Sequence, residues 1–346
     1  MTRVLIGMSG GVDSTVGASL LLRDAYDVVG VTLLLSDEQR FKDGADAARS
    51  ACEKLGIEHR TVDVREDFEQ QVAQRVLADV AAGLEPDAGV LCQRFILQQL
   101  FKLAREERVM KVATGHYASI VSATDGIGTY PLRLMRAKDR SRDQSFQLYD
   151  LDQSQMNMLV LPLAQVMELD VRMHAMRAGL MFPEYDPDDT PLLYGKGSSR
   201  AQWVERRGAG MPAGKIIALD GGTVLGEHNG LHAVSLGQKI TLADGSECFA
   251  VAKDYATNTV YAGLQELAKG ESCLLKNVHW TSVHPIQERR SCRVKFDVRG
   301  TARPVQLAPQ GDKLLMSFTI PVEGLASGKT AVFYSDDMVL GGAVIA

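Results

Sequence analysis

The residues best suited to chemistry lie in a short glycine-rich string near the amino terminus. It reads Ser9-Gly10-Gly11-Val12-Asp13-Ser14 and follows a short apolar run over residues 4–8. Adjacent glycines let backbone N–H groups approach a bound anion, and a helix beginning there adds more N–H groups and a positive dipole end. Ser9 and Ser14 offer hydroxyls, and Asp13 offers a carboxylate for Mg²⁺ on phosphates. The string predicts a phosphate-binding loop; the alternative is a tight turn in which Asp13 or Ser14 caps the helix.

Cysteine is the second residue type that can carry chemistry, and the chain has five in 346 residues. Their odd number and wide spacing do not indicate a disulfide framework and favour a reduced, cytosolic compartment. Cys92 is expected at the start of a helix, where the helix dipole lowers a thiol pKa. A reactive thiolate and an ordinary buried helix cysteine both stay open for it. The others are predicted to be structural, namely Cys52, Cys248, Cys273 and Cys292.

Strand and helix alternate through the first half of the chain, and these elements must position both the glycine-rich string and Cys92. The alternation predicts a doubly wound parallel sheet, an α/β fold whose ligands bind beyond the carboxyl ends of the strands. A helical extension is expected over 151–182. The expected strands are 4–8, 27–35, 58–64 and 111–114, and the expected helices are 15–22, 43–55, 67–82 and 91–107.

The second half of the chain indicates β structure. Residues 183–199 contain three prolines and two glycines and are interpreted as a loop or linker. Asp220-Gly221-Gly222 and Asp244-Gly245 are hairpin signals. Two small β-rich domains are therefore expected after the parallel sheet. The predicted boundaries are 1–195 for the α/β domain with its helical extension, 196–264 for a central β domain and 265–346 for a carboxyl-terminal β-barrel.

Composition narrows the class of protein. Hydrophobic residues make up 45% and charged residues 23%, which excludes a mostly disordered or low-complexity chain. No run reaches the ~18–20 apolar residues of a membrane helix, and the Met-Thr-Arg start leads straight into a strand, so no membrane partner is expected. The net charge of −5 argues against a uniformly basic nucleic-acid surface. Arginines cluster over 200–207 and 289–293. Each cluster is interpreted either as a local basic patch or as a solvated charged face.

Five segments together resemble a known family. The string at 9–14 resembles the PP-loop of ATP pyrophosphatases, and it is not a Walker A pattern. Segments 113–118, 134–146, 225–238 and 328–342, in this order and spacing, resemble the tRNA-specific 2-thiouridylase family over nearly the whole chain. The resemblance implies an ATP-dependent sulfurtransferase acting on tRNA in the cytoplasm. A uridine O2 would be adenylated with release of pyrophosphate, and sulfur would then displace AMP.

The resemblance also implies site residues. Asp13 would be catalytic and hold Mg²⁺, and Arg142 stands where the family usually has lysine, which keeps a cation there. His116 faces the nucleotide or is a polar residue at a domain edge, and His228 contacts tRNA or belongs to a turn held by its own hydrogen bonds. ATP would be bound by Gly7, Met8, Ser9, Gly10, Gly11, Val12, Asp13, Ser14, Leu33, Gly115 and His116. The tRNA would be bound by Arg142, Asp143, Gln144, Ser145, His228 and Gln238.

The sulfur step depends on cysteines, of which the family uses two. The first carries over to Cys92 as the catalytic sulfur carrier, whereas the second falls on Pro191, which has no thiol. A sulfur-donor protein or a small thiol or sulfide would then be a partner. Cys92 alone cannot hold an iron–sulfur cluster, which takes three or four cysteines. A divergent paralogue, a PP-loop adenylating enzyme with another nucleophile or substrate, and a non-catalytic RNA-binding relative stay open.

Overall fold

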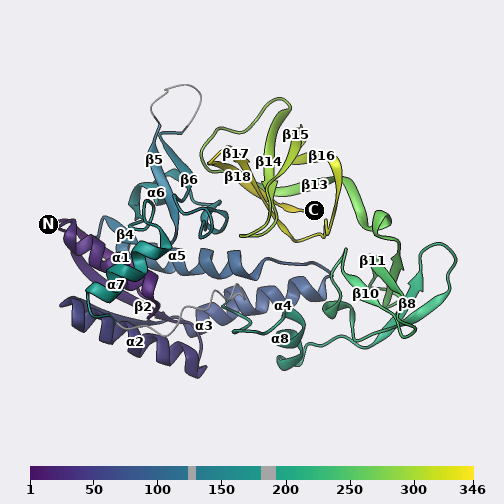
Figure 1. Ribbon diagram of the computed structural model, residues 1–346, viewed down its shortest axis with the longest axis horizontal. Coiled ribbons are helices and arrows are strands. Elements are labelled where there is room, and N and C mark those ends of the chain that lie inside the picture. Colours follow the sequence, from purple (N-terminus) through teal and green to yellow (C-terminus); the bar gives the residue numbers. More distant parts are fainter. Residues whose placement is uncertain (124–129, 181–191) are drawn as a thin grey trace.

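The computed structural model describes residues 1–123, 130–180 and 192–346. Three regions follow one another along the chain in Figure 1: an α/β region in purple to teal, a green β region, and a yellow-green β region that carries the carboxyl terminus. Within the described ranges, no helix has both the length and the apolar character needed to cross a bilayer.

The α/β region contains a five-stranded sheet in the order β3-β2-β1-β4-β7, with every neighbouring pair parallel. The order reverses direction between β1 and β4, so the loops after these two strands diverge and leave a crevice between them. This is the expected doubly wound sheet. Its strands are β1 (Arg3–Gly7), β2 (Asp27–Leu34), β3 (Glu58–Asp63), β4 (Lys111–Ala113) and β7 (Leu159–Val160).

Alternate side chains of β1 enter two different cores, because successive strand residues point to opposite faces. Val4 and Ile6 pack in the core formed with α1 and α2, whereas Leu5 packs with α5. The sheet is therefore covered on both faces, which explains its continuous apolar strands. The helices here are α1 (Val12–Arg23), α2 (Gln39–Leu55), α3 (Arg65–Phe68), a π-helical turn (Glu69–Ala73), α4 (Gln74–Ala81) and α5 (Ala88–Glu106).

The helical extension expected over 151–182 is interrupted by a short strand. The described part of this stretch forms α6 (Gln153–Met158), then β7, then α7 (Glu168–Arg177). A capping box of Asp152 and Gln155 starts α6. Leu159 and Val160 then pair in parallel with β4, and this edge pairing outweighs the local helical preference.

A hairpin from the first region joins the last sheet of the molecule. It consists of β5 (Ala118–Ser122) and β6 (Leu132–Arg136), and Met135 of β6 pairs with Met338 of β18. The six later strands close into a barrel because β13 pairs with both β16 and β18. They are β13 (Lys269–Trp280), β14 (Arg290–Lys295), β15 (Arg303–Gln310), β16 (Lys313–Glu323), β17 (Thr330–Ser335) and β18 (Met338–Ile345).

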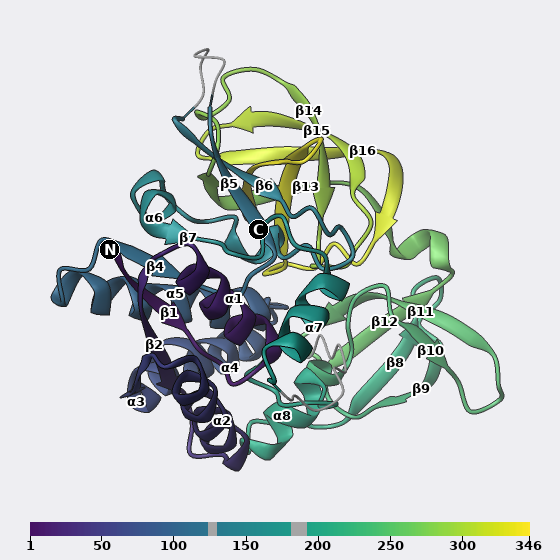
Figure 2. The same cartoon turned by 60° about the vertical axis from the view of Figure 1, so that its left-hand side comes forward.

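The central region follows a short helix, α8 (Arg200–Arg206), and holds a five-stranded sheet in the order β10-β11-β12-β8-β9. The hairpin signals at 220–222 and 244–245 are confirmed, since they join β8 to β9 and β10 to β11. Figure 2 shows this sheet beside α8 and below the carboxyl-terminal barrel. Its strands are β8 (Gly214–Ala218), β9 (Val224–His228), β10 (Lys239–Thr241), β11 (Glu247–Asp254) and β12 (Thr259–Gly263). Short 3₁₀ turns cover Ser145–Leu148, Leu231–Ala233 and Gln265–Ala268.

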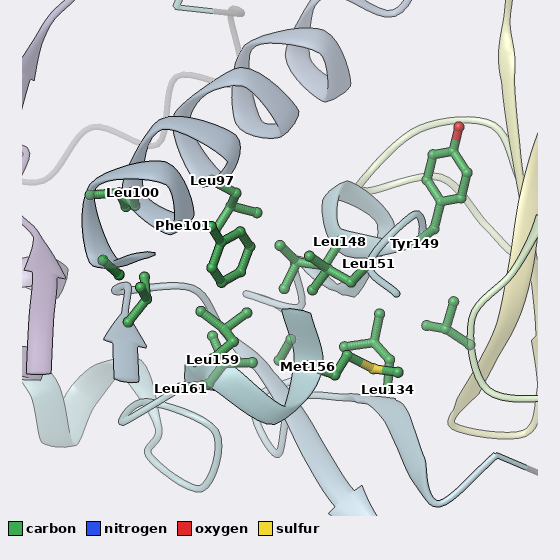
Figure 3. Packing of buried hydrophobic residues seen from close by; sticks show 14 of the residues in the cluster. Leu97, Leu100, Phe101, Leu134, Leu148, Tyr149, Leu151, Met156, Leu159 and Leu161 are labelled. Carbon is green, nitrogen blue, oxygen red and sulfur yellow. The ribbon is translucent and has the colours of Figure 1, made fainter. Parts of the chain in front are cut away.

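One hydrophobic cluster connects the α/β region to the barrel. Figure 3 shows Phe101 of α5 and Leu134 of β6 among the side chains of this cluster, with Leu148 lying between the helix and the hairpin. Val332 and Val339 of the barrel belong to the same cluster. Each large apolar side chain buried in this way contributes about 1.5–3 kcal/mol. The hairpin and the barrel are therefore held against the α/β region by apolar packing.

Candidate functional site

The loop after β1 has the geometry of an anion site. Gly10 has a φ of +80°, and a Cβ there would lie 2.5 Å from the carbonyl oxygen of Gly44, so only glycine fits. Ser14 Oγ accepts a hydrogen bond from the Ser9 backbone N–H at 3.2 Å and donates one to the Gly11 carbonyl at 3.2 Å. Gly11 is the N-cap of α1 and supplies no side-chain cap. The first N–H groups of α1 are thus left for a ligand.

A cavity of about 430 Å³ lies at the carboxyl ends of β1 and β4. Most of the residues predicted to bind ATP line it, and so does Gln144. Gly10, Gly11 and Val12 belong to the adjoining loop and do not line it. The predicted residues that line it are Gly7, Met8, Ser9, Asp13, Ser14, Leu33, Gly115 and His116. Those not predicted are Val31, Thr32, Leu35, Arg40, Phe41, Gly44, Gln93, Ile96, Leu100, Thr114 and Leu192.

Asp13 is held by two side chains from other parts of the chain. Its Oδ1 accepts a hydrogen bond from the Tyr117 hydroxyl at 2.8 Å, and its Oδ2 accepts one from Arg142 at 3.1 Å. The Arg142 guanidinium also lies 5.2 Å from the centre of the Tyr117 ring. Burial raises the pKa of Asp13, while the hydrogen bond from Tyr117 and the charge of Arg142 lower it. Tyr117 was missing from the predicted site, although it directly follows His116 in a segment that resembles the family.

The segment 142–145 divides its side chains between the cavity and the barrel. Gln144 lines the cavity and accepts a hydrogen bond from the Tyr117 N–H at 3.0 Å. Asp143 instead is buried, where it accepts hydrogen bonds from Arg136 Nε at 3.0 Å and from the Ala137 N–H at 3.1 Å. Ser145 Oγ donates to Asp143 at 3.1 Å and contacts the hydroxyl of Tyr334 of β17 at 3.3 Å. Asp143 and Ser145 therefore connect this segment to the barrel and do not line the cavity.

His116 lies in the wall of the cavity with only 8% of its surface exposed. Its Nδ1 shares a hydrogen bond of 2.8 Å with Thr114 Oγ1. Burial lowers the pKa of His116 to about 4, so its imidazole is neutral near pH 7. Such a ring offers a neutral donor or acceptor to the cavity and no positive charge.

Of the two alternatives for Cys92, the structure shows the buried helix cysteine. The helix begins four residues earlier, at Ala88, and Cys92 is 1% exposed in a cluster with Phe95 and Leu193. Burial raises the pKa of the Cys92 thiol to about 12, and a hydrogen bond from the Leu193 backbone opposes this only in part. The expectation that the helix start lowers this pKa is therefore wrong for this conformation. Arg94, two residues further along the helix, forms an ion pair with Asp150.

The other cysteines are also free thiols, and Cys52 and Cys248 are buried while Cys273 and Cys292 are partly exposed. Among the described residues, no group of three or more His, Cys, Asp or Glu side chains is arranged to hold a metal ion. The position predicted for the second family cysteine, Pro191, lies outside the described residues.

The two predicted tRNA contacts of the central region lie away from this cavity. His228 accepts a hydrogen bond from the Gly230 N–H at 3.1 Å, and its Nε2 contacts the Asn258 carbonyl at 3.2 Å. Both ring nitrogens thus hold a turn together. Gln238 lines a second cavity, formed between the three regions. The arginines at 200–207 contact other parts of the chain, since Arg206 donates to the Tyr194 carbonyl and Arg207 forms an ion pair with Glu69.

Known families match the three regions in turn. Residues 2–190 match the tRNA methyl transferase HUP domain, residues 202–264 the tRNA methyl transferase PRC-barrel domain, and residues 270–345 the aminomethyltransferase beta-barrel domain. Together with the observed sheets, these matches confirm the expected fold class of a doubly wound parallel sheet followed by two small β-rich domains.

Full-length relatives define the family. The tRNA-specific 2-thiouridylase MnmA of Synechococcus sp. (strain CC9605) is 34% identical over 363 residues, covering 99% of this chain and 93% of the relative. MnmA of Picosynechococcus sp. (strain ATCC 27264 / PCC 7002 / PR-6) is 33% identical over 356 residues, covering 100% and 98%. Among solved structures, the U34-tRNA thiolase NcsA from Methanococcus maripaludis has a TM-score of 0.38 and 20% identity, covering 55% of this chain and 61% of that one. The chain belongs to the tRNA-specific 2-thiouridylase family, as its sequence motifs predicted.

Proposed function

We propose that this protein is an ATP-dependent tRNA uridine 2-sulfurtransferase of the cytoplasm. Membership of the 2-thiouridylase family over the full chain carries the proposal. The cavity beyond β1 and β4 supports it, because the Ser9–Ser14 loop and the start of α1 direct N–H groups to one end of a space large enough for a nucleotide. We also propose domain boundaries after residues 195 and 264, as predicted from the sequence.

The proposed reaction has two steps. In the first, the O2 of a uridine bonds to the α-phosphorus of the substrate ATP, and the bond to the bridging oxygen breaks as pyrophosphate leaves. In the second, a sulfur nucleophile bonds to C2 of the uridine and AMP leaves with the O2 atom. A uridine within RNA must leave its stack to reach the cavity. The chain positions the phosphates with the loop after β1 and excludes water with the buried walls around His116.

Asp13 is the residue that fits a magnesium ion. Mg²⁺ keeps several waters and takes one or two carboxylates beside the phosphates of a bound nucleotide, and Asp13 supplies one carboxylate at the loop. When bound, Mg²⁺ would neutralise charge on the leaving pyrophosphate. Arg142 and Tyr117 fix the orientation of the Asp13 carboxylate, and Arg142 adds a positive charge beside it.

Cys92 is the proposed sulfur carrier, and its burial sets a condition on that role. Gln93 and Ile96, on the same helix, line the ATP cavity, whereas Cys92 lies behind Leu193. Residues 192–194 must therefore move before Cys92 can receive or deliver sulfur. A persulfide on Cys92 would attack C2 with its outer sulfur. Because Pro191 has no thiol, the sulfur of an external thiol from a donor protein or small molecule would then bond to Cys92 Sγ as the S–S bond breaks, which releases 2-thiouridine. The mixed disulfide left on Cys92 would be reduced by a second external thiol.

The burial of Cys92 also favours a second candidate function. A PP-loop enzyme that adenylates an oxygen and then adds a nucleophile other than Cys92 sulfur would need no reactive cysteine. Such an enzyme would tolerate a Cys92 thiol with a pKa of about 12. The two candidates differ in whether Cys92 is required for turnover.

The deciding experiment measures 2-thiouridine in tRNA. Nucleosides from the wild-type strain and a deletion strain are compared by mass spectrometry, and the deletion strain is complemented with Cys92→Ser or with Cys273→Ser as the matched control. The proposed function predicts loss of 2-thiouridine in the deletion, recovery with Cys273→Ser and none with Cys92→Ser. Full recovery with Cys92→Ser would favour a sulfur route without Cys92. Unchanged 2-thiouridine in the deletion would contradict thiolation altogether.

A further inference from the structure

A second cavity, of about 470 Å³, lies where the three regions meet. Its wall includes Asp87 at the start of α5, Tyr194 and Arg200 around α8, Gln238 of the central region, and Phe296 and Lys329 of the barrel. No residue lines both this junction cavity and the ATP cavity. Its volume lies within the ~300–1,000 Å³ typical of small-ligand sites. The proposed reaction leaves this cavity without a role.

The junction cavity has an unmatched hydrogen-bond donor on a cation. Arg200 donates to Ser235 Oγ at 3.2 Å, and its Nη1 lies 3.8 Å from Glu85. Its Nε is buried and has no acceptor among the described residues. A buried donor without an acceptor is destabilising, so a ligand acceptor at this position is stabilising.

The charges around the cavity favour an anion. Glu85 is already neutralised by Lys253, whose Nζ lies 3.0 Å from its Oε1. Lys329 Nζ contacts the Gly324 carbonyl at 3.4 Å, lies 6.0 Å from the centre of the Phe296 ring, and its charge lowers the pKa of Asp87. Asp87 caps α5 by accepting a hydrogen bond from the Val90 N–H at 3.1 Å, and burial raises its pKa. Arg200 and Lys329 are the two cations of the wall that can meet a phosphate.

The remaining wall suits a nucleobase. Tyr194 and Phe296 are aromatic residues of the wall, and aromatic rings can stack on bases. Gln238 accepts a hydrogen bond from the Ser235 N–H through Oε1, so its amide N–H groups stay available for a base carbonyl. Aromatic surface, an amide donor and two cations together match one nucleotide.

We propose that the junction cavity binds one unstacked nucleotide of the RNA substrate, separate from the uridine that reacts in the ATP cavity. The inference rests on the proposed function for the identity of the RNA. A nucleotide seated there would touch all three regions at once, so the cavity would align the RNA with the ATP site before chemistry.

The test measures tRNA affinity over a range of salt concentrations for wild type, Lys329→Gln, Phe296→Leu and the exposed control Lys102→Gln. Lys329→Gln should lose one phosphate contact. The slope of log K against log salt should then become shallower by ~0.7–0.9, and binding should weaken about fivefold. Phe296→Leu should weaken binding about tenfold with an unchanged slope. Lys102→Gln should match wild type. Affinity and slope equal to wild type in both cavity variants would overturn the inference.

Two further arms identify the occupant. A tRNA that carries a photoreactive uridine should cross-link to peptides containing Tyr194 or Phe296. Absence of such adducts would overturn the inference. Titration with free UMP and AMP should show weak or no binding outside the ATP cavity. Tight binding of either, lost in Lys329→Gln, would assign the cavity to a soluble nucleotide instead. Failure of the proposed function is seen separately, as tRNA that binds but gains no 2-thiouridine.

Discussion

The burial of Cys92 leads to a prediction about its reactivity. A thiol with a pKa of about 12 is a thiolate in about one molecule in 10⁴ at pH 8, whereas an unperturbed thiol, with a pKa of about 8.5, is a thiolate in about one in four. The ionisation difference alone slows alkylation about 2,000-fold. Because the side chain is 1% exposed, restricted access slows the reaction further.

The assay follows iodoacetamide labelling of the Cys92 peptide by mass spectrometry. The reference is the same peptide in the urea-unfolded chain, which removes differences in peptide detection. We expect native labelling at least ~10³-fold slower at pH 8, rising about tenfold for each pH unit up to pH 11. Leu193→Ala should speed the labelling, because it removes side-chain cover from Cys92, and Leu169→Ala on the exposed face of α7 should not.

The sulfur-carrier role adds a second expectation. If residues 192–194 move during catalysis, tRNA and a non-hydrolysable ATP analogue together should accelerate labelling of Cys92. Native labelling within tenfold of the unfolded rate, without ligands, would refute the buried-thiol reasoning. Labelling that stays slow with both ligands present would separate Cys92 from the reaction and favour the second candidate function.

Three other perturbations test the site. Replacing Arg142 with alanine should slow tRNA-dependent pyrophosphate release about a hundredfold, whereas Arg142→Lys keeps a cation beside Asp13 and should stay within tenfold of wild type; equal rates for the two variants would contradict this. Asp143→Ala should lower the free energy of unfolding by about 3–5 kcal/mol in urea melts, because it leaves Arg136 without its buried partner; a change below 1 kcal/mol would contradict that. Acid should destabilise the protein through His116: the unfolded chain takes up its proton below pH ~6.5 and the native chain only near pH 4, so the free energy of unfolding falls by about 3 kcal/mol across that window. His116→Gln should flatten this slope and the exposed control His284→Gln should not.

The sequence predicted those parts of the site that are formed by neighbouring residues. The Ser9–Ser14 string is a local signal, since its glycines, hydroxyls and following helix all act within six residues. The strand–helix alternation likewise predicted the sheet, and the rule for the carboxyl ends of strands then placed His116 and Gly115 near the loop.

The parts that depend on distant pairing were not predictable. The cap at Asp87 starts α5 before Cys92 and turns that thiol toward Leu193, 101 residues away in the chain. Asp143 resembled a substrate contact, but Tyr334 and Ser145 enclose it, and the barrel that supplies Tyr334 comes near the end of the chain. No local pattern near Asp143 or Cys92 carries this information.

The hairpin of β5 and β6 has a consequence for synthesis of the chain. Its partner strand contains Met338, 203 residues after Met135, so it leaves the ribosome roughly 10–40 s later at ~5–20 residues per second. During that interval the outer edge of β6 and the apolar face around Leu134 lack their final partner, and such an edge invites pairing with other chains. Loss of the last strand would make this exposure permanent and would leave the first domain prone to aggregation after translation.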